Sequence, residues 1–241
     1  MGLSVFSKIS RWDGMRLIIF DVDGTLTDTM AVDAQCFLRS FAEVFDFAGV
    51  DPDWSLYKNA TDAGIVNEVF ESRTGRAPSE METVKFREHL VALFRSASRE
   101  ASFAAVAGAR ELLAQLGCMD AYQVALATGC WRDSARVKMA SAGMSYDDYP
   151  SASADDAVDR ESIIKLAIER ASRRIGGKFS GAVYVGDGVW DARACRNLGI
   201  PFIGIGAQGE KLAAAGAARI FSDLSDADSL LASMEKILPV K

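Results

Sequence analysis

The feature that most constrains the fold of this chain is a recurrence of nearly continuous apolar runs with helical segments between them. Apolar runs without polar alternation are typical of strands in a parallel sheet that is covered on both faces. Such runs occupy residues 15–20, 122–127, 181–186 and 201–206, and "ARIFSDL" suggests one more short strand. Helical patterns occupy residues 108–116, 132–142, 161–174, 190–198 and 226–237. This alternation predicts an open α/β sheet with right-handed crossovers.

One interval interrupts the alternation, because residues 29–103 contain helix signals and no strand-like run. The segment "AQCFLRSFAEVFDF" places aromatic side chains three and four residues apart, which is the spacing of an amphipathic helix. Ser79 and Glu82 match a capping box at the start of another helix. We therefore expect an all-helical cap domain at 29–103, inserted into an α/β core made of residues 15–28 and 104–241.

Composition excludes several classes of protein. The 241 residues carry a net charge of −6 without a basic block, which argues against a nucleic-acid partner or an acidic membrane surface. No apolar run approaches the roughly 20 residues that span a bilayer, and no signal peptide is expected at the N-terminus. Four scattered cysteines are typical of reduced thiols, so a cytoplasmic location is expected. A single histidine excludes chemistry built on several histidines.

Carboxylates follow two of the predicted strands. Asp21 and Asp23 come directly after the first apolar run, and Asp187 and Asp191 come after the third. Parallel sheets bind ligands at the carboxyl ends of their strands, so neighbouring strands would bring these acids together. Gathered acids repel one another unless a proton or a cation stabilises them, and Mg²⁺ is the preferred ion for such oxygen ligands. The alternative for "GDGVWD" alone is an ordinary turn with Asp191 as a helix cap.

These segments resemble the motifs of the haloacid dehalogenase superfamily. "FDVDGTLTD" is similar to the first motif of its phosphatase branch, "LATG" at 126–129 to the second, and "VGDGVWD" to the fourth. The inserted helical interval is similar to the family's helical cap, and the resemblance covers about 15–206. It implies a Rossmann-like core sheet, and the phosphoglycolate phosphatases and β-phosphoglucomutases are the most similar branch.

The resemblance also implies roles for the acids. Asp21 would attack phosphorus and form an aspartyl-phosphate. Asp23 would protonate the leaving oxygen and then activate water. Mg²⁺ would bind Asp21, the backbone carbonyl of Asp23, and Asp187, with Asp191 as a further ligand or as the holder of a metal-bound water.

Phosphoryl oxygens would bind Thr128 and the backbone N–H of Gly129 in the second motif. The third motif is the least distinct, since the Lys-Pro pair found in many relatives is absent. Its cation would be Arg160, at the expected start of a helix, or Lys165, five residues later.

Substrate contacts from the cap are expected in the polar segment "YKNATDAG". Lys58, Asn59, Thr61 and Asp62 could face the substrate there, and a solvated loop is the alternative.

The leading hypothesis is a Mg²⁺-dependent phosphatase that acts on a small phosphorylated metabolite, as a monomer or a homodimer. A phosphomutase of the β-phosphoglucomutase kind is the alternative. A phosphonatase is less favoured: that branch depends on a cap lysine, for which Lys58 is the candidate, and the presence of Asp23 argues against it. A non-catalytic binding module is also less favoured, because it would be expected to have lost some of the acids.

Overall fold

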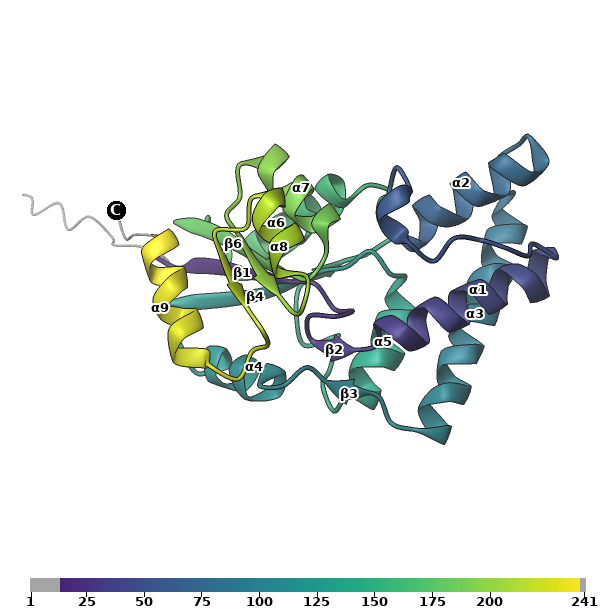
Figure 1. The fold of residues 1–241 in the computed structure, drawn as a ribbon. Coiled ribbons are helices and arrows are strands. Elements are labelled where there is room, and N and C mark those ends of the chain that lie inside the picture. Colours follow the sequence, from purple (N-terminus) through teal and green to yellow (C-terminus); the bar gives the residue numbers. More distant parts are fainter. Residues whose placement is uncertain (1–13, 239–241) are drawn as a thin grey trace, which may run out of the picture.

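A six-stranded parallel sheet lies at the centre of residues 14–238, the part of the chain that this computed structural model describes (Figure 1). Its order is β5-β4-β1-β6-β7-β8. The strands are β1 (Arg16–Phe20), β4 (Tyr122–Ala127), β5 (Ser151–Ala152), β6 (Gly181–Gly186), β7 (Phe202–Ile205) and β8 (Arg219–Phe221). The predicted strands are confirmed, whereas β5 was missed because two residues leave no periodicity to detect. The N-terminal segment in which no signal peptide is expected lies outside the described residues.

Helices cover both faces of the sheet, which explains why its strands are apolar throughout. Side chains of β1 alternate between the two faces, with Ile18 and Phe20 in one core and Leu17 and Ile19 in the other. The first face packs against α4 (Ala109–Gly117), α5 (Arg132–Ser141) and α9 (Ala227–Ile237). The second packs against α6 (Arg160–Ile175), α7 (Val189–Leu198) and α8 (Gly209–Ala215).

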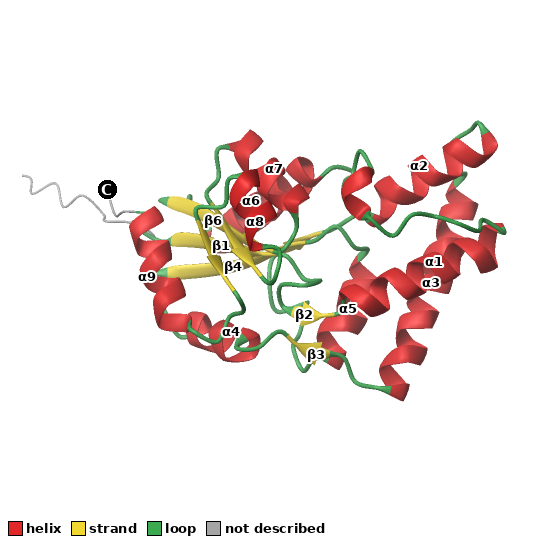
Figure 2. Ribbon diagram, viewed as in Figure 1, coloured by secondary structure: helices red, strands yellow, loops and turns green. Residues whose placement is uncertain are grey.

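A helical lobe lies beyond the carboxyl ends of the central strands and is the insertion expected from the sequence (Figure 2). It contains α1 (Met30–Phe45), the 3₁₀ turn η1 (Trp54–Leu56), α2 (Asp62–Thr74) and α3 (Glu80–Glu100). Phe37, Phe41 and Phe86 stack edge-on or tilted in its core, with ring centroids 4.8–5.4 Å apart. Buried aromatic clusters of this kind stabilise a small domain strongly, because each ring removes a large apolar area from water.

The lobe is joined to the sheet through a short antiparallel pair, β2 (Thr27–Asp28) and β3 (Ala104–Ala105). The helix ends inside the lobe follow the sequence signals: Ser79 and Glu82 form the predicted capping box at the start of α3. The pair β2–β3 places both connections of the lobe next to the residues that follow β1. Among the described residues, no helix combines the length and hydrophobicity that a membrane crossing requires.

Candidate functional site

The motif residues lie at the carboxyl ends of the three central strands. β1 lies between β4 and β6, and all three run in the same direction. Asp21 follows β1, Thr128 follows β4, and Asp187 follows β6. The order of the strands therefore brings to Asp21 two side chains that are each more than a hundred residues from it in the sequence.

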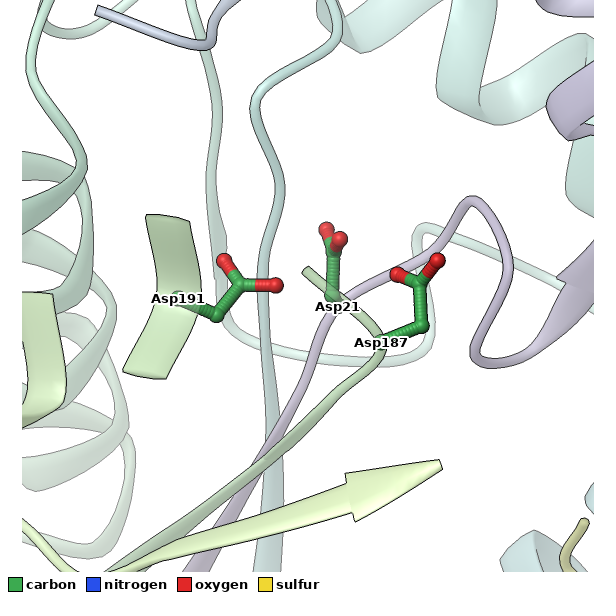
Figure 3. A group of neighbouring side chains, drawn as sticks. All are labelled: Asp21, Asp187 and Asp191. Carbon is green, nitrogen blue, oxygen red and sulfur yellow. The ribbon is translucent and has the colours of Figure 1, made fainter. Parts of the chain in front are cut away.

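Three carboxylates lie close together at these strand ends, and Figure 3 shows Asp21 between Asp187 and Asp191. One oxygen of each lies within 4.8 Å of the other two. All three side chains are buried, and Asp191 is 0% exposed. Asp191 stands in the first turn of α7, where it accepts hydrogen bonds from the Gly188 N–H and the Tyr184 hydroxyl, both at 3.3 Å.

Burial and mutual repulsion make these carboxylates hard to ionise without a cation. Burial raises the pKa of Asp21, and the neighbouring charge of Asp23 adds to the rise while Arg160 opposes it. Burial, together with Asp21 and Asp191, raises the pKa of Asp187 well above its ordinary value. Burial, opposed by Arg160 and aided by Asp21, raises the pKa of Asp191 to about 7. A bound cation would reverse these shifts.

The surroundings of Asp187 fit a metal ligand. Its Oδ1 atom is buried and has no hydrogen-bond partner, which is costly for a carboxylate unless an ion fills the position. Gly24 passes so close that a Cβ on it would lie 2.2 Å from Asp187 Oδ2, and its φ is +74°. Only glycine allows the chain after Asp23 to turn this tightly against the carboxylate.

Arg160 is the cation at the centre of these acids. Its Nη1 lies 3.2 Å from Asp21 Oδ1 and 3.2 Å from Asp191 Oδ1, and the residue is 9% exposed. It is the first residue of α6, as the sequence suggested. Lys165, on the same helix, is exposed and forms no ion pair with these acids.

Asp23 makes different contacts from the other motif acids. Its carboxylate accepts a hydrogen bond from the Thr29 hydroxyl at 2.5 Å and pairs with Lys138 Nζ at 2.8 Å. Burial alone would raise its pKa, but Lys138 and Thr29 lower the pKa below its ordinary value. The Asp23 side chain does not belong to the group of three acids, so its expected contribution to a metal would come from the backbone carbonyl.

Lys138 is the residue that the sequence reading missed. It is 0% exposed and also pairs with Asp33 of α1, so it joins the α/β core to the inserted lobe. Burial alone would lower its pKa, but Asp23 and Asp33 raise the pKa well above its ordinary value. A signal was present: Lys138 lies between Ala135 and Met139 on the buried stripe of α5, where an apolar residue is expected.

The second motif contacts both the site and the lobe. Thr128 is 1% exposed, and its hydroxyl accepts a hydrogen bond from the Cys130 backbone N–H at 3.3 Å. The carbonyl of Gly129 accepts a hydrogen bond from the Asp62 N–H at 2.8 Å. A Cβ on Gly129 would lie 2.5 Å from the Arg160 guanidinium, so glycine lets the arginine and the lobe approach together.

A cavity of about 40 Å³ connects these groups with the lobe. Its wall includes Asp21, Asp23, Thr128, Gly129 and Arg160 from the core, and Thr61 and Asp62 from the lobe. Of the expected cap contacts, Lys58 and Asn59 are not on this wall but line a neighbouring cavity. The Lys58 side chain is exposed, and its backbone N–H donates to Glu68 at 2.9 Å.

Solved structures share this fold over most of their length. A hydrolase from Pseudomonas syringae matches with a TM-score of 0.70 and 20% identity, over 91% of this chain and 99% of its own. CbbY from Rhodobacter sphaeroides in complex with phosphate gives 0.66 and 20%, over 88% and 96%. A predicted phosphoglycolate phosphatase from Haemophilus somnus gives 0.62 and 15%, over 92% and 99%. Identities this low show a common fold alone.

No curated protein matches this sequence. A family model does match, and it covers residues 15–199 under the description haloacid dehalogenase-like hydrolase. That range contains the strands β1, β4, β5 and β6, the three gathered acids, Arg160 and the inserted helices, and so includes the site at the carboxyl ends of the central strands. The chain therefore belongs to the haloacid dehalogenase-like hydrolases.

Proposed function

We propose that this protein is a Mg²⁺-dependent phosphatase that hydrolyses a small phosphomonoester through an aspartyl-phosphate at Asp21. The observation that carries the proposal is the position of the Asp21 carboxylate, within 4.8 Å of two further buried acids and 3.2 Å from Arg160. A nucleophilic carboxylate, a place for a divalent cation and a guanidinium are the groups that a transferring phosphoryl group requires.

In the first step, an Asp21 oxygen attacks phosphorus while the bond from phosphorus to the alcohol oxygen breaks. The proton on Asp23 moves to that oxygen, and the alcohol leaves. In the second step, water attacks phosphorus, its proton moves to Asp23, and the bond to Asp21 breaks to release inorganic phosphate. Thr128 and the Gly129 N–H would hold phosphoryl oxygens throughout, and Arg160 would offset their charge.

The metal would be held by Asp21, Asp187, Asp191 and the backbone carbonyl of Asp23. Buried carboxylate oxygens, one of them without a hydrogen-bond partner, fit a hard divalent cation such as Mg²⁺. When bound, the ion would neutralise charge on the phosphoryl group and on the three carboxylates.

Asp23 must be protonated to act as an acid, whereas Lys138 and Thr29 favour its ionised form. A bound phosphoryl group brings negative charge next to Asp23 and thereby raises its pKa. We infer that substrate binding, and not the empty pocket, sets the protonation that the first step needs.

The inserted helices would act as a cap on the core, with residues 29–103 as the cap and residues 15–28 and 104–241 as the core. The contacts of the cap loop support this role: the Asp62 N–H donates to Gly129, and the Thr61 hydroxyl donates to the Val158 carbonyl at 2.6 Å. A cavity of about 40 Å³ is too small for a substrate to enter without movement, so the cap would open and close in each turnover.

The direct test is a screen of phosphorylated small molecules for phosphate release, with Mg²⁺ and with a chelator. We expect release that depends on Mg²⁺ and recovers when the chelator is titrated away. Release that is equally fast in the chelator would contradict the metal assignment. Product analysis separates a phosphomutase from a phosphatase, because a mutase returns the phosphoryl group to an isomerised product.

Mg²⁺ should also stabilise the fold, and the stabilisation should increase with pH. A carboxyl group whose pKa is raised by folding stabilises the folded state, and this contribution is complete only at pH values below the ordinary pKa. That stability is lost as the pH rises through the folded value, which is about 7 for Asp191. Mg²⁺ binds the ionised form and restores the loss. Thermal denaturation with Mg²⁺ and with a chelator should therefore give a larger difference in Tm at about pH 8 than at about pH 5.

An Asp187→Asn variant is the matched control for this measurement, since it removes one ligand and keeps the shape of the side chain. Its gain in Tm from Mg²⁺ should be much smaller than that of the wild type at the higher pH. An equal gain at both pH values in the wild type would mean that Mg²⁺ binds elsewhere.

A further inference from the structure

The part of the cavity that lies beyond the phosphoryl site has an unusual wall. Helix α1 contributes Asp33 and Phe37, and the segment around the start of α2 contributes Asp62 and Ile65. Among the residues that the structure describes, Arg160 is the only cationic residue on the wall of this cavity. The guanidinium already lies between Asp21 and Asp191, so it is positioned for the phosphoryl group and not for the rest of a substrate.

The buried charges on the cap side do not balance. Lys138 stands between Asp23 and Asp33, and its side chain is 0% exposed. Asp62 is a third carboxylate near the same group, and its Oδ2 accepts the Trp131 backbone N–H at 2.8 Å. Burial and the charge of Asp33 raise the pKa of Asp62 well above its ordinary value. Three acids, Asp23, Asp33 and Asp62, thus share one ammonium. A divalent ion at Asp187 would offset the charge of the separate group formed by Asp21, Asp187 and Asp191.

A second anionic group on a substrate would find no cationic side chain besides Arg160 among the described residues on this wall. It would lose its hydration and stand next to carboxylates, which is costly on both counts. An ammonium would find the opposite environment, because a nearby cation lowers the raised pKa of Asp33 and of Asp62 and favours their ionised forms. Trp54 and Trp190 are also on the wall and present aromatic rings, which attract cations.

The neighbouring cavity does not change this conclusion for a short substrate. It holds the cationic side chains Lys58 and Arg193, but it lies behind residues that line both cavities: Trp54, Ala60, Arg160 and Trp190. A substituent of three or four atoms on the phosphoryl group reaches these shared walls before it reaches Lys58 or Arg193.

We propose that this site selects phosphomonoesters of short alcohols that carry an amino group, and rejects those whose alcohol carries a second anionic group. This inference rests on the proposed phosphatase function and adds the chemical class of the substrate. It also distinguishes this chain from enzymes that accept sugar bisphosphates or phosphoglycolate.

The experiment compares three esters of nearly equal size that differ in the charge of the substituent. They are 2-aminoethyl phosphate, n-propyl phosphate and phosphoglycolate, assayed at neutral pH with Mg²⁺. We expect kcat/KM for 2-aminoethyl phosphate to exceed that for the propyl ester by at least about threefold. Phosphoglycolate should fall below the propyl ester by at least about thirtyfold. For any ester that is not turned over, its Ki as a competitor of p-nitrophenyl phosphate gives the same order.

The variant Asp62→Asn tests whether the order of kcat/KM among the three esters depends on the acids of the inserted lobe, Asp33 and Asp62. The amide oxygen can still accept the Trp131 N–H, so the fold should be kept, and the thermal transition checks this. The ratio of kcat/KM for the ammonium ester to that for the carboxylate ester should fall by about tenfold. In Lys58→Met the order of the three esters should remain, and its loss would transfer the selectivity to the neighbouring cavity and overturn the proposal.

The outcomes separate this inference from the function on which it rests. Mg²⁺-dependent hydrolysis of p-nitrophenyl phosphate, combined with a preference for phosphoglycolate or with equal rates for all three esters, would overturn the substrate class and leave the phosphatase intact. Absence of any Mg²⁺-dependent hydrolysis would overturn both.

Discussion

Asp21→Asn should release phosphate from p-nitrophenyl phosphate at less than about 10⁻³ of the wild-type rate. An amide is isosteric with the carboxylate but cannot attack phosphorus, so the chemical step is lost while the pocket keeps its shape. The loss should appear in kcat, because Thr128, Gly129 and Arg160 still bind the phosphoryl group. The fold should not weaken, since Arg160 keeps its ion pair with Asp191 and the substitution removes one of three mutually repelling buried carboxylates. The measurements are steady-state kinetics and the thermal transition of both proteins.

Asp28→Asn is the matched control, because it makes the same chemical change seven residues later on an exposed side chain. It should retain nearly all activity. Acid quenching of the wild type with a radiolabelled ester should leave label on the peptide that contains Asp21, and no label should remain on the Asn variant. Wild-type rates in Asp21→Asn would remove this residue as the nucleophile.

Lys138→Met should destabilise the protein by about 3–5 kcal/mol near neutral pH, the range observed when one partner of a buried ion pair is removed. Methionine fills the volume of the lysine stem but leaves Asp23 and Asp33 buried without a cation. For a chain of this size, such a loss corresponds to a fall in Tm of roughly 6–20 °C. The loss should be smaller at acidic pH, because protonation neutralises the unpaired carboxylates.

Lys165→Met is the control for this substitution, since Lys165 is exposed on α6 and should change stability by less than about 0.5 kcal/mol. Adding Asp33→Asn to Lys138→Met should recover part of the stability, because it removes one of the two unpaired charges. A double variant no more stable than Lys138→Met alone would show that the lysine acts through packing and not through charge.

Much of the α/β core was predictable because it is encoded locally. Strands buried on both faces need continuous apolar runs, and the runs at β1, β4 and β6 therefore mark the centre of the sheet directly. Short elements were not predictable: β2, β3 and β5 have two residues each, too few for a period. Their pairing is fixed by the neighbouring strand and not by their own sequence.

The acids of the site were predictable for a related reason. Asp21 and Asp187 follow long apolar runs, and parallel strands place such residues at one edge of a sheet. The cap contacts were less predictable, because "YKNATDAG" contains several polar residues in an irregular segment. Helix α2 begins within this segment, and its N-cap residue Thr61 and its first residue Asp62 line the cavity, whereas Lys58 stays exposed.

The sequence by itself therefore determined the succession of strands and helices along the chain, the inserted helical segment, and the acids that meet at the carboxyl ends of the strands. These depend on hydrophobic period and on position along the chain. Only the tertiary structure decided that Arg160 lies beside Asp21, 139 residues away, and that Lys138 pairs with Asp33, 105 residues away. Such pairs form because burial of a charge requires an opposite charge nearby, and no local pattern records which distant residue supplies it.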